Sequence, residues 1–187
     1  MSRENVELVR YPLSVRATSR RNRRERLALR FSGVVALGGR AIQRLSPRSR
    51  LRQKLVRRAA RLFLEAYNRK DVEAAYALYH PDCETIIPHQ LVTVGAFEPT
   101  VRGSQARLSV QRRWHAEWGE FRIESTEVID LGDRVLTLGH VRGSGLSSGA
   151  GIDSEWGVIC TFAAGWIVRE QVFLDHDDAL QAVGLSE

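Results

Sequence analysis

The stretch from residue 154 to residue 175, SEWGVICTFAAGWIVREQVFLD, decides the fold of this 187-residue chain. Large apolar side chains recur at every second position from Trp156 to Phe162, which is the period of a β-strand with one face in a core. A tight hairpin follows, because Gly165 can adopt the positive φ that such a turn needs. Residues 166–174 form a second strand, and Asp175 is the expected N-cap of a last helix. The chain therefore ends in a β-hairpin followed by a helix.

The residues before this stretch extend the sheet toward the N-terminus. Two further strands are predicted over residues 121–129 and 135–141, joined by a Leu-Gly-Asp turn at 131–133. A Gly/Ser-rich connection at 143–151 leads from them into the hairpin. Strands that follow one another through short turns pair in antiparallel fashion. This half of the chain therefore predicts an antiparallel sheet.

Helices dominate the first half of the chain. Ser46-Pro47 is a coherent start signal for a helix that runs to about Asn68. Asp71 begins a second helix, residues 91–101 form a loop, and Gly103 opens a third helix. The apolar face predicted for this third helix comprises Ala106, Val110, Trp114 and Trp118, at a spacing of four. Helices followed by strands predict an α+β fold with a curved antiparallel sheet.

Charge divides the chain in two. Residues 1–61 contain 18 basic and three acidic residues, a net charge of +15, whereas the remaining residues contain ten basic and 19 acidic ones, a net charge of −9. This split predicts a basic, partly helical N-terminal extension over residues 1–50 and an α+β domain over residues 51–187. One or two short helices are expected in the extension, interrupted at Gly38-Gly39.

The basic segment over residues 20–61 has two interpretations. Its arginines are interspersed with apolar residues such as Leu27 and Phe31, which suits an amphipathic helix on an anionic membrane surface better than a tail on nucleic acid. The alternative, which we favour, is a helical cap that packs its apolar side on the domain or on a second subunit and leaves its arginines in water. The opposite charge of the domain supports the cap.

Other patterns bear on compartment and cofactors. No secretory signal is recognisable, and the longest apolar stretch, 31–39, is shorter than the roughly 20 residues of a membrane-spanning helix. Cys83 and Cys160 form no redox or metal motif and are expected to be buried thiols. No phosphate loop, nucleophile elbow or histidine pair at metal-ligand spacing occurs. We therefore expect a cytoplasmic protein, peripheral at the membrane if the basic segment binds lipid, with no cofactor and no metal ion.

Several short segments, taken in order, carry a resemblance to a known family. They are FLEAYNRKDVEAA at 63–75, HPD at 80–82, VRG at 101–103, IDLGDRV at 129–135 and GWIVR at 165–169. On these segments the chain, from about residue 54 on, resembles the SnoaL-like branch of the nuclear transport factor 2-like superfamily. The resemblance implies a cone, in which a strongly bent sheet wraps helices and leaves an apolar pocket. Members include polyketide cyclases, ketosteroid isomerases and non-catalytic binding or dimerisation modules, so the fold alone decides no function.

The candidate for acid/base chemistry is His140, which stands in an apolar strand and would titrate near neutral pH if it faced the pocket. The alternative is a histidine on the solvated outer face. Glu155 is a weaker candidate, because it is out of phase with the apolar face of its strand. For the cyclases, the resemblance implies a carboxylate close to residue 158, and Val158 cannot move a proton. This difference favours binding over catalysis.

Aromatic and polar side chains supply the predicted pocket wall. The candidates are Tyr76, Tyr79, His89, Arg102, Trp114 and Trp118. The aromatic rings would stack on a flat apolar ligand, although such residues also serve as ordinary core. Arg102 is placed either to hold an anionic group or to brace its own loop.

The sequence therefore predicts a protein that binds a small apolar, polyketide-like or steroid-like molecule and forms a homodimer. Two alternatives stay open. One is a cofactor-independent acid/base enzyme, such as an isomerase, dehydratase, cyclase or hydrolase. The other is a protein-interaction or membrane-surface module that uses the basic segment.

Overall fold

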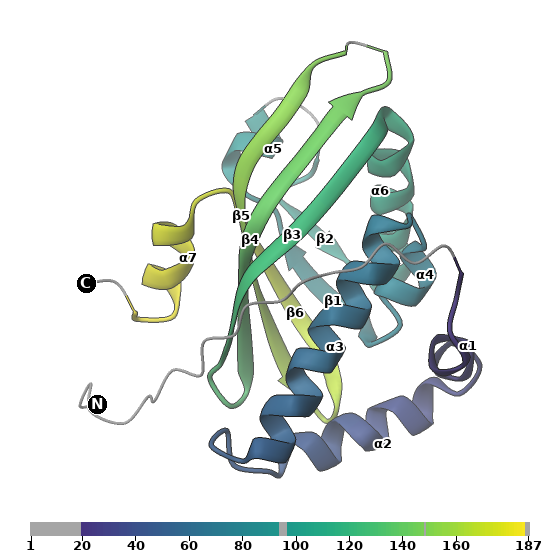
Figure 1. Cartoon of the computed structure of the whole chain (residues 1–187), viewed down its shortest axis with the longest axis vertical. Coiled ribbons are helices and arrows are strands. Elements are labelled where there is room, and N and C mark those ends of the chain that lie inside the picture. Colours follow the sequence, from purple (N-terminus) through teal and green to yellow (C-terminus); the bar gives the residue numbers. More distant parts are fainter. Residues whose placement is uncertain (1–19, 94–96, 148, 186–187) are drawn as a thin grey trace.

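A bent six-stranded sheet forms the wall of a cone, and helices fill its concave side (Figure 1). The computed structural model describes residues 20–93, 97–147 and 149–185. The strands are β1 (Tyr79–Ile86), β2 (Thr100–Arg102), β3 (Trp118–Asp130), β4 (Arg134–Gly145), β5 (Gly151–Ala163) and β6 (Trp166–Phe173), in the spatial order β2-β1-β6-β5-β4-β3. The helices are α1 (Arg23–Arg30), α2 (Ser32–Gln43), α3 (Arg50–Asn68), α4 (Val72–Ala75), α5 (His89–Thr93), α6 (Ser104–Glu117) and α7 (His176–Ala182). The predicted α+β class is confirmed.

The hairpin at the end of the sheet forms as the sequence predicts. β5 and β6 pair in antiparallel fashion through a turn at Ala164 and Gly165, both of which have positive φ. Val158 lies opposite Val172 in this pair, so both side chains point to the same face. That face is the inside of the cone, where Trp156 and Val158 are buried.

One strand pair differs from the antiparallel prediction. β1 and β6 run parallel, with Glu84 beside Arg169 and Thr85 beside Glu170. A short turn forces the two strands that it joins to be antiparallel, but most of the domain lies between β1 and β6 in the sequence, so no turn fixes their direction. As a result, Glu170 of β6 stands between β1 and β5, well inside the sheet.

The long helix α3 begins later than predicted. The amide of Ser49 donates to the carbonyl of Ser46, which closes a turn over the Ser46-Pro47 segment. Ser49 is therefore the N-cap, and its hydroxyl accepts a hydrogen bond from the Arg52 amide. α3 ends at Asn68 as predicted, and Leu64 and Ala66 lie fully buried against the sheet.

The helix α6 turns an unexpected face to the core. Gly103 is its N-cap, as predicted. Its buried residues, however, are Arg107, Gln111 and His115, whereas Trp114 is only half-buried. The predicted apolar face is therefore wrong. Arg107 and Gln111 face inward because they have hydrogen-bond partners on β6, on α3 and at the end of α4. The predicted loop over residues 91–101 also contains the end of α5 and most of β2.

In the described part of the N-terminal extension, residues 20–50, two helices meet at Phe31, and the glycines lie inside α2 instead of interrupting it. Residues 1–19 of the predicted extension lie outside the described residues. The small size of Gly39 is needed for contact with the domain. A Cβ atom on Gly39 would clash with the Gly165 carbonyl, and one on Gly165 would clash with the Ala36 carbonyl. α2 therefore packs backbone to backbone on the β5–β6 turn, across the end of the cone (Figure 1).

A second, smaller core covers the convex side of the sheet. It joins Ile129, Leu136 and Ile159 to Ala179 of α7. Asp175 caps α7 by accepting a hydrogen bond from the Asp178 amide at 3.0 Å, as predicted. Figure 1 shows α7 on the opposite side of the sheet from α3 and α6. The interior of the cone is thus left to α2, α3, α4 and α6.

Candidate functional site

An apolar chamber of about 380 Å³ lies between α2, α3 and the concave face of the sheet. Small-molecule sites commonly start at about 300 Å³. The wall residues from α2 and α3 include Val35, Gly38, Gly39, Ile42, Leu55, Val56, Ala59 and Ala60, and those from the sheet include Val135, Val158, Cys160, Phe162 and Ile167. Glycine and alanine on the helices leave the space open, because larger side chains at those positions would fill it.

The extension supplies one end of this chamber through α2. The Arg40 Nε atom donates to the Ala164 carbonyl at 2.8 Å. The Gly165 amide donates to the Gln43 Oε1 atom at 2.9 Å. Both bonds fasten α2 to the β5–β6 turn beside the close approach of Gly39 and Gly165. The chamber is therefore closed at this end by residues outside the predicted domain.

A buried ion pair fastens the C-terminal end of α2. Arg52 of α3 is 3% exposed and donates through Nε and Nη2 to the two carboxylate oxygens of Asp130, at 2.7 and 2.8 Å. Its Nη1 atom donates to the carbonyls of Ile42, Gln43 and Leu45, at 3.4, 3.2 and 2.9 Å. The last carbonyls of a helix have no partner within the helix. Arg52 thus satisfies the end of α2 and joins it to the sheet.

A second cavity of about 70 Å³ lies further toward α6. It holds about two water-sized groups. Phe63 and Trp156 line both spaces and form the partition between them. The small cavity is bordered by aromatic rings and by the ion pair of Arg107 and Glu170.

Glu170 is the centre of a buried polar network. Its side chain is 2% exposed, and Oε1 accepts a hydrogen bond from the Tyr79 hydroxyl at 2.8 Å. Oε2 accepts from the Thr85 hydroxyl at 3.0 Å and from the Arg107 Nε atom at 2.8 Å. A carboxylate has about four acceptor positions. Three of them are occupied by the protein itself.

Gln111 extends this network toward α3. With its amide oriented to satisfy its neighbours, its oxygen accepts hydrogen bonds from Arg107 and from the Tyr76 hydroxyl, and its nitrogen donates to the Tyr67 hydroxyl. Burial raises the pKa of all three tyrosines of the network, so their hydroxyls stay neutral. Burial, the largest single influence, would lower the pKa of Arg107. The charge and hydrogen bond of Glu170, together with Tyr76 and Tyr79, nevertheless raise the pKa above its ordinary value. The network therefore holds one fixed ion pair among neutral donors.

His115 lies one helical turn further along α6. It is 5% exposed, its ring is 4.6 Å from that of Tyr67, and both ring nitrogens lack a hydrogen-bond partner within the described structure. Burial, together with the charges of Lys70 and Arg107, lowers the pKa of His115 to about 4. The ring is therefore neutral at physiological pH.

The predicted pocket residues divide into three groups. Tyr76 and Trp114 border the small cavity, and Tyr79 borders the chamber. Trp118 packs against Trp114 and Phe121 without bordering either space. His89 and Arg102 lie on the surface. His89 contacts Thr93 within α5, and the Arg102 side chain is 80% exposed and pairs with Glu84 at 3.2 Å.

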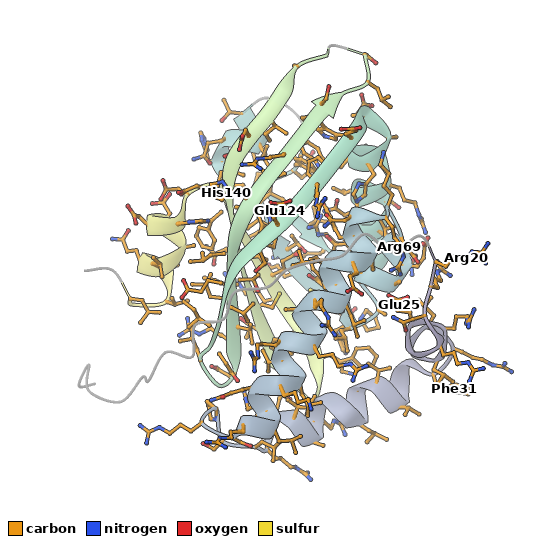
Figure 2. All side chains as sticks on the ribbon, viewed as in Figure 1. Arg20, Glu25, Phe31, Arg69, Glu124 and His140 are labelled. Carbon is orange, nitrogen blue, oxygen red and sulfur yellow. The ribbon has the colours of Figure 1, made fainter. Side chains whose placement is uncertain are left out.

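His140 lies on the convex face of the sheet. Its neighbour Val141 borders the small cavity, so His140 points the other way, toward α7, where its ring is 5.7 Å from that of His176 (Figure 2). Glu155 is also on this side, since its Oε2 atom accepts a hydrogen bond from the His176 amide at 2.8 Å. These two candidates for proton transfer are thus placed together, but outside both cavities.

The buried residues that organise the interior were missed from the sequence. Arg107, Gln111 and His115 share a spacing of four, the same signal that drew attention to the apolar residues of α6. Arg52 and Glu170 carry no local signal, because the charged partner of each is far away in the sequence. Asp130 is 78 residues from Arg52, and Arg107 is 63 residues from Glu170.

Among the residues that the structure describes, no group of three or more His, Cys, Asp or Glu is placed to hold a metal ion. No helix in the described part of the chain is long and apolar enough to cross a membrane.

The comparisons with solved structures identify the fold. An NTF2-like protein of unknown function from Burkholderia pseudomallei is 21% identical with a TM-score of 0.57, over 68% of this chain and 95% of that one. TerC co-crystallised with polyporic acid is 21% identical with a TM-score of 0.55, over 64% and 90% of the two chains. A protein with a ketosteroid isomerase-like fold from Catenulispora acidiphila, in complex with trimethylamine, is 15% identical with a TM-score of 0.53, over 68% and 92%.

No curated protein matches the sequence. The model of the SnoaL-like domain family, in contrast, matches residues 60–170. This range runs from the second half of α3 into β6 and includes most of the sheet residues that line the two cavities. Since the match spans more than half of the sequence, the chain belongs to the SnoaL-like domain family.

Proposed function

We propose that this protein binds a small apolar molecule in the 380 Å³ chamber and does not transform it. The observation that carries the proposal is the chamber itself, which is lined mainly by aliphatic, aromatic and glycine residues. The small cavity is too narrow for such a ligand. Support also comes from TerC and the Catenulispora protein, whose structures were obtained with polyporic acid and with trimethylamine.

The ionisable groups on the chamber wall are already engaged. Arg52 is paired with Asp130, and the Tyr79 hydroxyl donates to Glu170. Burial raises the pKa of the Cys160 thiol, which is therefore protonated. Val158, also on the wall, has no ionisable group. The ligand is thus expected to be held by shape and apolar contact, with few polar groups of its own.

Two matched variants test this proposal. Val158→Phe places an aromatic ring in the chamber, whereas Val172→Phe, at the cross-strand neighbour on β6, places one in the small cavity. Binding of N-phenyl-1-naphthylamine, a neutral fluorescent probe, is expected to be lost in Val158→Phe and kept in Val172→Phe. Equal probe binding by the wild type and Val158→Phe would contradict the proposal, provided both unfold at similar temperatures.

Acid/base catalysis is the second candidate function. The observation that favours it is Glu170, a carboxylate on the wall of the small cavity with one acceptor position left. The test is to extract the molecule that copurifies with the protein and to incubate it with wild type and Glu170→Gln. Conversion by the wild type alone, seen by mass spectrometry, would establish an enzyme.

The remaining predictions concern assembly and location. Four properties stay predictions: a homodimer, a boundary between extension and domain at residue 50, a cytoplasmic location, and contact of residues 20–61 with an anionic membrane. Light scattering after gel filtration measures the oligomeric state directly. The outer surface of α1 and α2 supports the membrane contact.

A further inference from the structure

α2 has two apolar faces with different surroundings. On the inner face, Val35, Gly39 and Ile42 border the chamber. On the outer face, Val34 and Leu37 are 66% and 61% exposed. A helix at the surface of a domain needs only its inner face to be apolar. The outer face of α2 is therefore fitted to contact something other than this domain or water.

The exposed apolar residues form one stripe. Leu27 lies one turn before Phe31, whose amide donates to the Leu27 carbonyl at the end of α1. Val34 and Leu37 follow Phe31 at spacings of three along α2, so successive members of the set are neighbours on the helix surface. Leu27 and Phe31 are 57% and 48% exposed. Figure 2 shows Phe31 at the corner of the two helices, pointing away from the domain. We call these four residues the apolar stripe.

The charge around the apolar stripe has one sign. Glu25 is the only acidic residue between residues 20 and 61, and it is turned inward, 6% exposed and 2.9 Å from Arg69 of the domain. Arg23, Arg26 and Arg30 are exposed on α1, and Arg30 lies over the Phe31 ring. The outer surface of the extension therefore combines apolar side chains with arginines and presents no carboxylate between residues 20 and 61.

An anionic lipid bilayer complements this surface. Helices that lie flat in the headgroup region bury apolar side chains between basic ones in this way. A second copy of the chain, packed through the same stripe, would set arginines against arginines. Nucleic acid would match the arginines but would leave the apolar stripe in water.

We propose that the apolar stripe docks on an anionic bilayer, and that the ligand of the chamber is a bilayer-soluble molecule that enters past α2. The second part rests on the proposed binding function. Docking brings the outer face of α2 into the lipid, while the inner face of the same helix borders the chamber. One helix thus separates the lipid from the ligand site.

The test of docking is sedimentation of the full chain with vesicles. Vesicles of phosphatidylcholine with about 30% phosphatidylglycerol are compared with vesicles of phosphatidylcholine alone. The variant Val34→Ser/Leu37→Ser is compared with Leu146→Ser, a residue that is 65% exposed in the β4–β5 connection, at the other end of the sheet from α2 (Figure 1). The double variant is expected to lose affinity for the anionic vesicles by at least about tenfold, and the control to keep it.

The same proteins separate docking from ligand binding. Val158→Phe is expected to sediment like the wild type but to bind no N-phenyl-1-naphthylamine, whether the probe is free or carried in vesicles. The double variant is expected to bind free probe normally but to take it up from vesicles more slowly.

Two sedimentation results would overturn the docking. One is equal sedimentation of the wild type with both kinds of vesicle, and the other is equal sedimentation of the double variant and the wild type with anionic vesicles. A stripe that instead mediates dimerisation or binding to duplex DNA would also overturn it. Uptake from vesicles that does not change in the double variant would overturn the route past α2.

Discussion

The buried ring of His115 predicts a loss of stability in mildly acidic solution. Its pKa is about 4 in the folded protein and 6.5 in an ordinary histidine, so the unfolded chain binds the proton more tightly. The contribution of His115 is thus fully present above pH 6.5, is lost as the pH falls toward 4, and changes no further below that. At about 1.4 kcal/mol for each pKa unit, the loss is at most about 3.5 kcal/mol.

Urea unfolding at several values between pH 7.5 and pH 4 measures this loss. The comparison is with His115→Phe, which keeps an aromatic ring against Tyr67 and Phe121 but cannot take up a proton. The difference in unfolding free energy between wild type and variant should change by up to about 3 kcal/mol over this range. His89→Gln, on the surface of α5, is the matched control.

Carboxylates that depend on arginine partners do not interfere with this comparison. Arg112 lowers the pKa of Glu73, and although burial would raise the pKa of Asp71, hydrogen bonds from Arg21 and the Ala74 amide lower it. Their effects appear at lower pH and are common to both proteins. If wild type and His115→Phe lost stability in parallel from pH 6.5 to 4, the reasoning about His115 would be refuted.

Three further predictions concern the ion pairs and the chamber. Arg52→Met should destabilise the protein by about 3–5 kcal/mol, because it leaves the buried Asp130 carboxylate without its partner, and it should make α2 cleavable by trypsin. If α2 stayed as resistant to trypsin as in the wild type, Arg52 would not be what holds α2 in place. Arg107→Met should lower the free energy of unfolding by a similar amount. The double change Arg107→Met/Glu170→Gln should lower it by less than the sum of the two single changes, since it leaves no buried charge, and additive effects would contradict the pairing. Gly165→Ala should lower the melting temperature and loosen α2, because the added methyl group collides with the Ala36 carbonyl and the residue has a positive φ. Gly149 also has a positive φ but open space around it, so Gly149→Ala measures the effect of backbone strain without a collision.

The outline of the fold could be predicted because it depends on neighbours in the sequence. The alternation from Trp156 to Phe162 and the glycine in the turn fix the β5–β6 hairpin without reference to the rest of the chain. The parallel pairing of β1 with β6 could not be found in this way, since no local feature of either strand specifies a partner across the sequence.

The interior was harder to predict for the same reason. Arg107 and Gln111 were overlooked because polar residues on a helix normally face water. Here, Glu170, Tyr67 and Tyr76, which come from distant segments, provide the hydrogen bonds that make their burial possible. His140 has an apolar neighbour on each side, and only the register of β4 decides that Val141 faces the cone and His140 faces α7.

The hydrogen bonds from Arg52 to the end of α2 link the evolution of the N-terminal extension to that of the domain. Three carbonyls of the extension share one guanidinium with Asp130, so losing residues 20–45 would leave buried donors without acceptors and open the chamber to water. An ancestor could not have dropped the extension and kept this arginine at no cost. Family members that lack such helices are therefore expected to carry a different residue where this chain has Arg52, and to close their cones by other means.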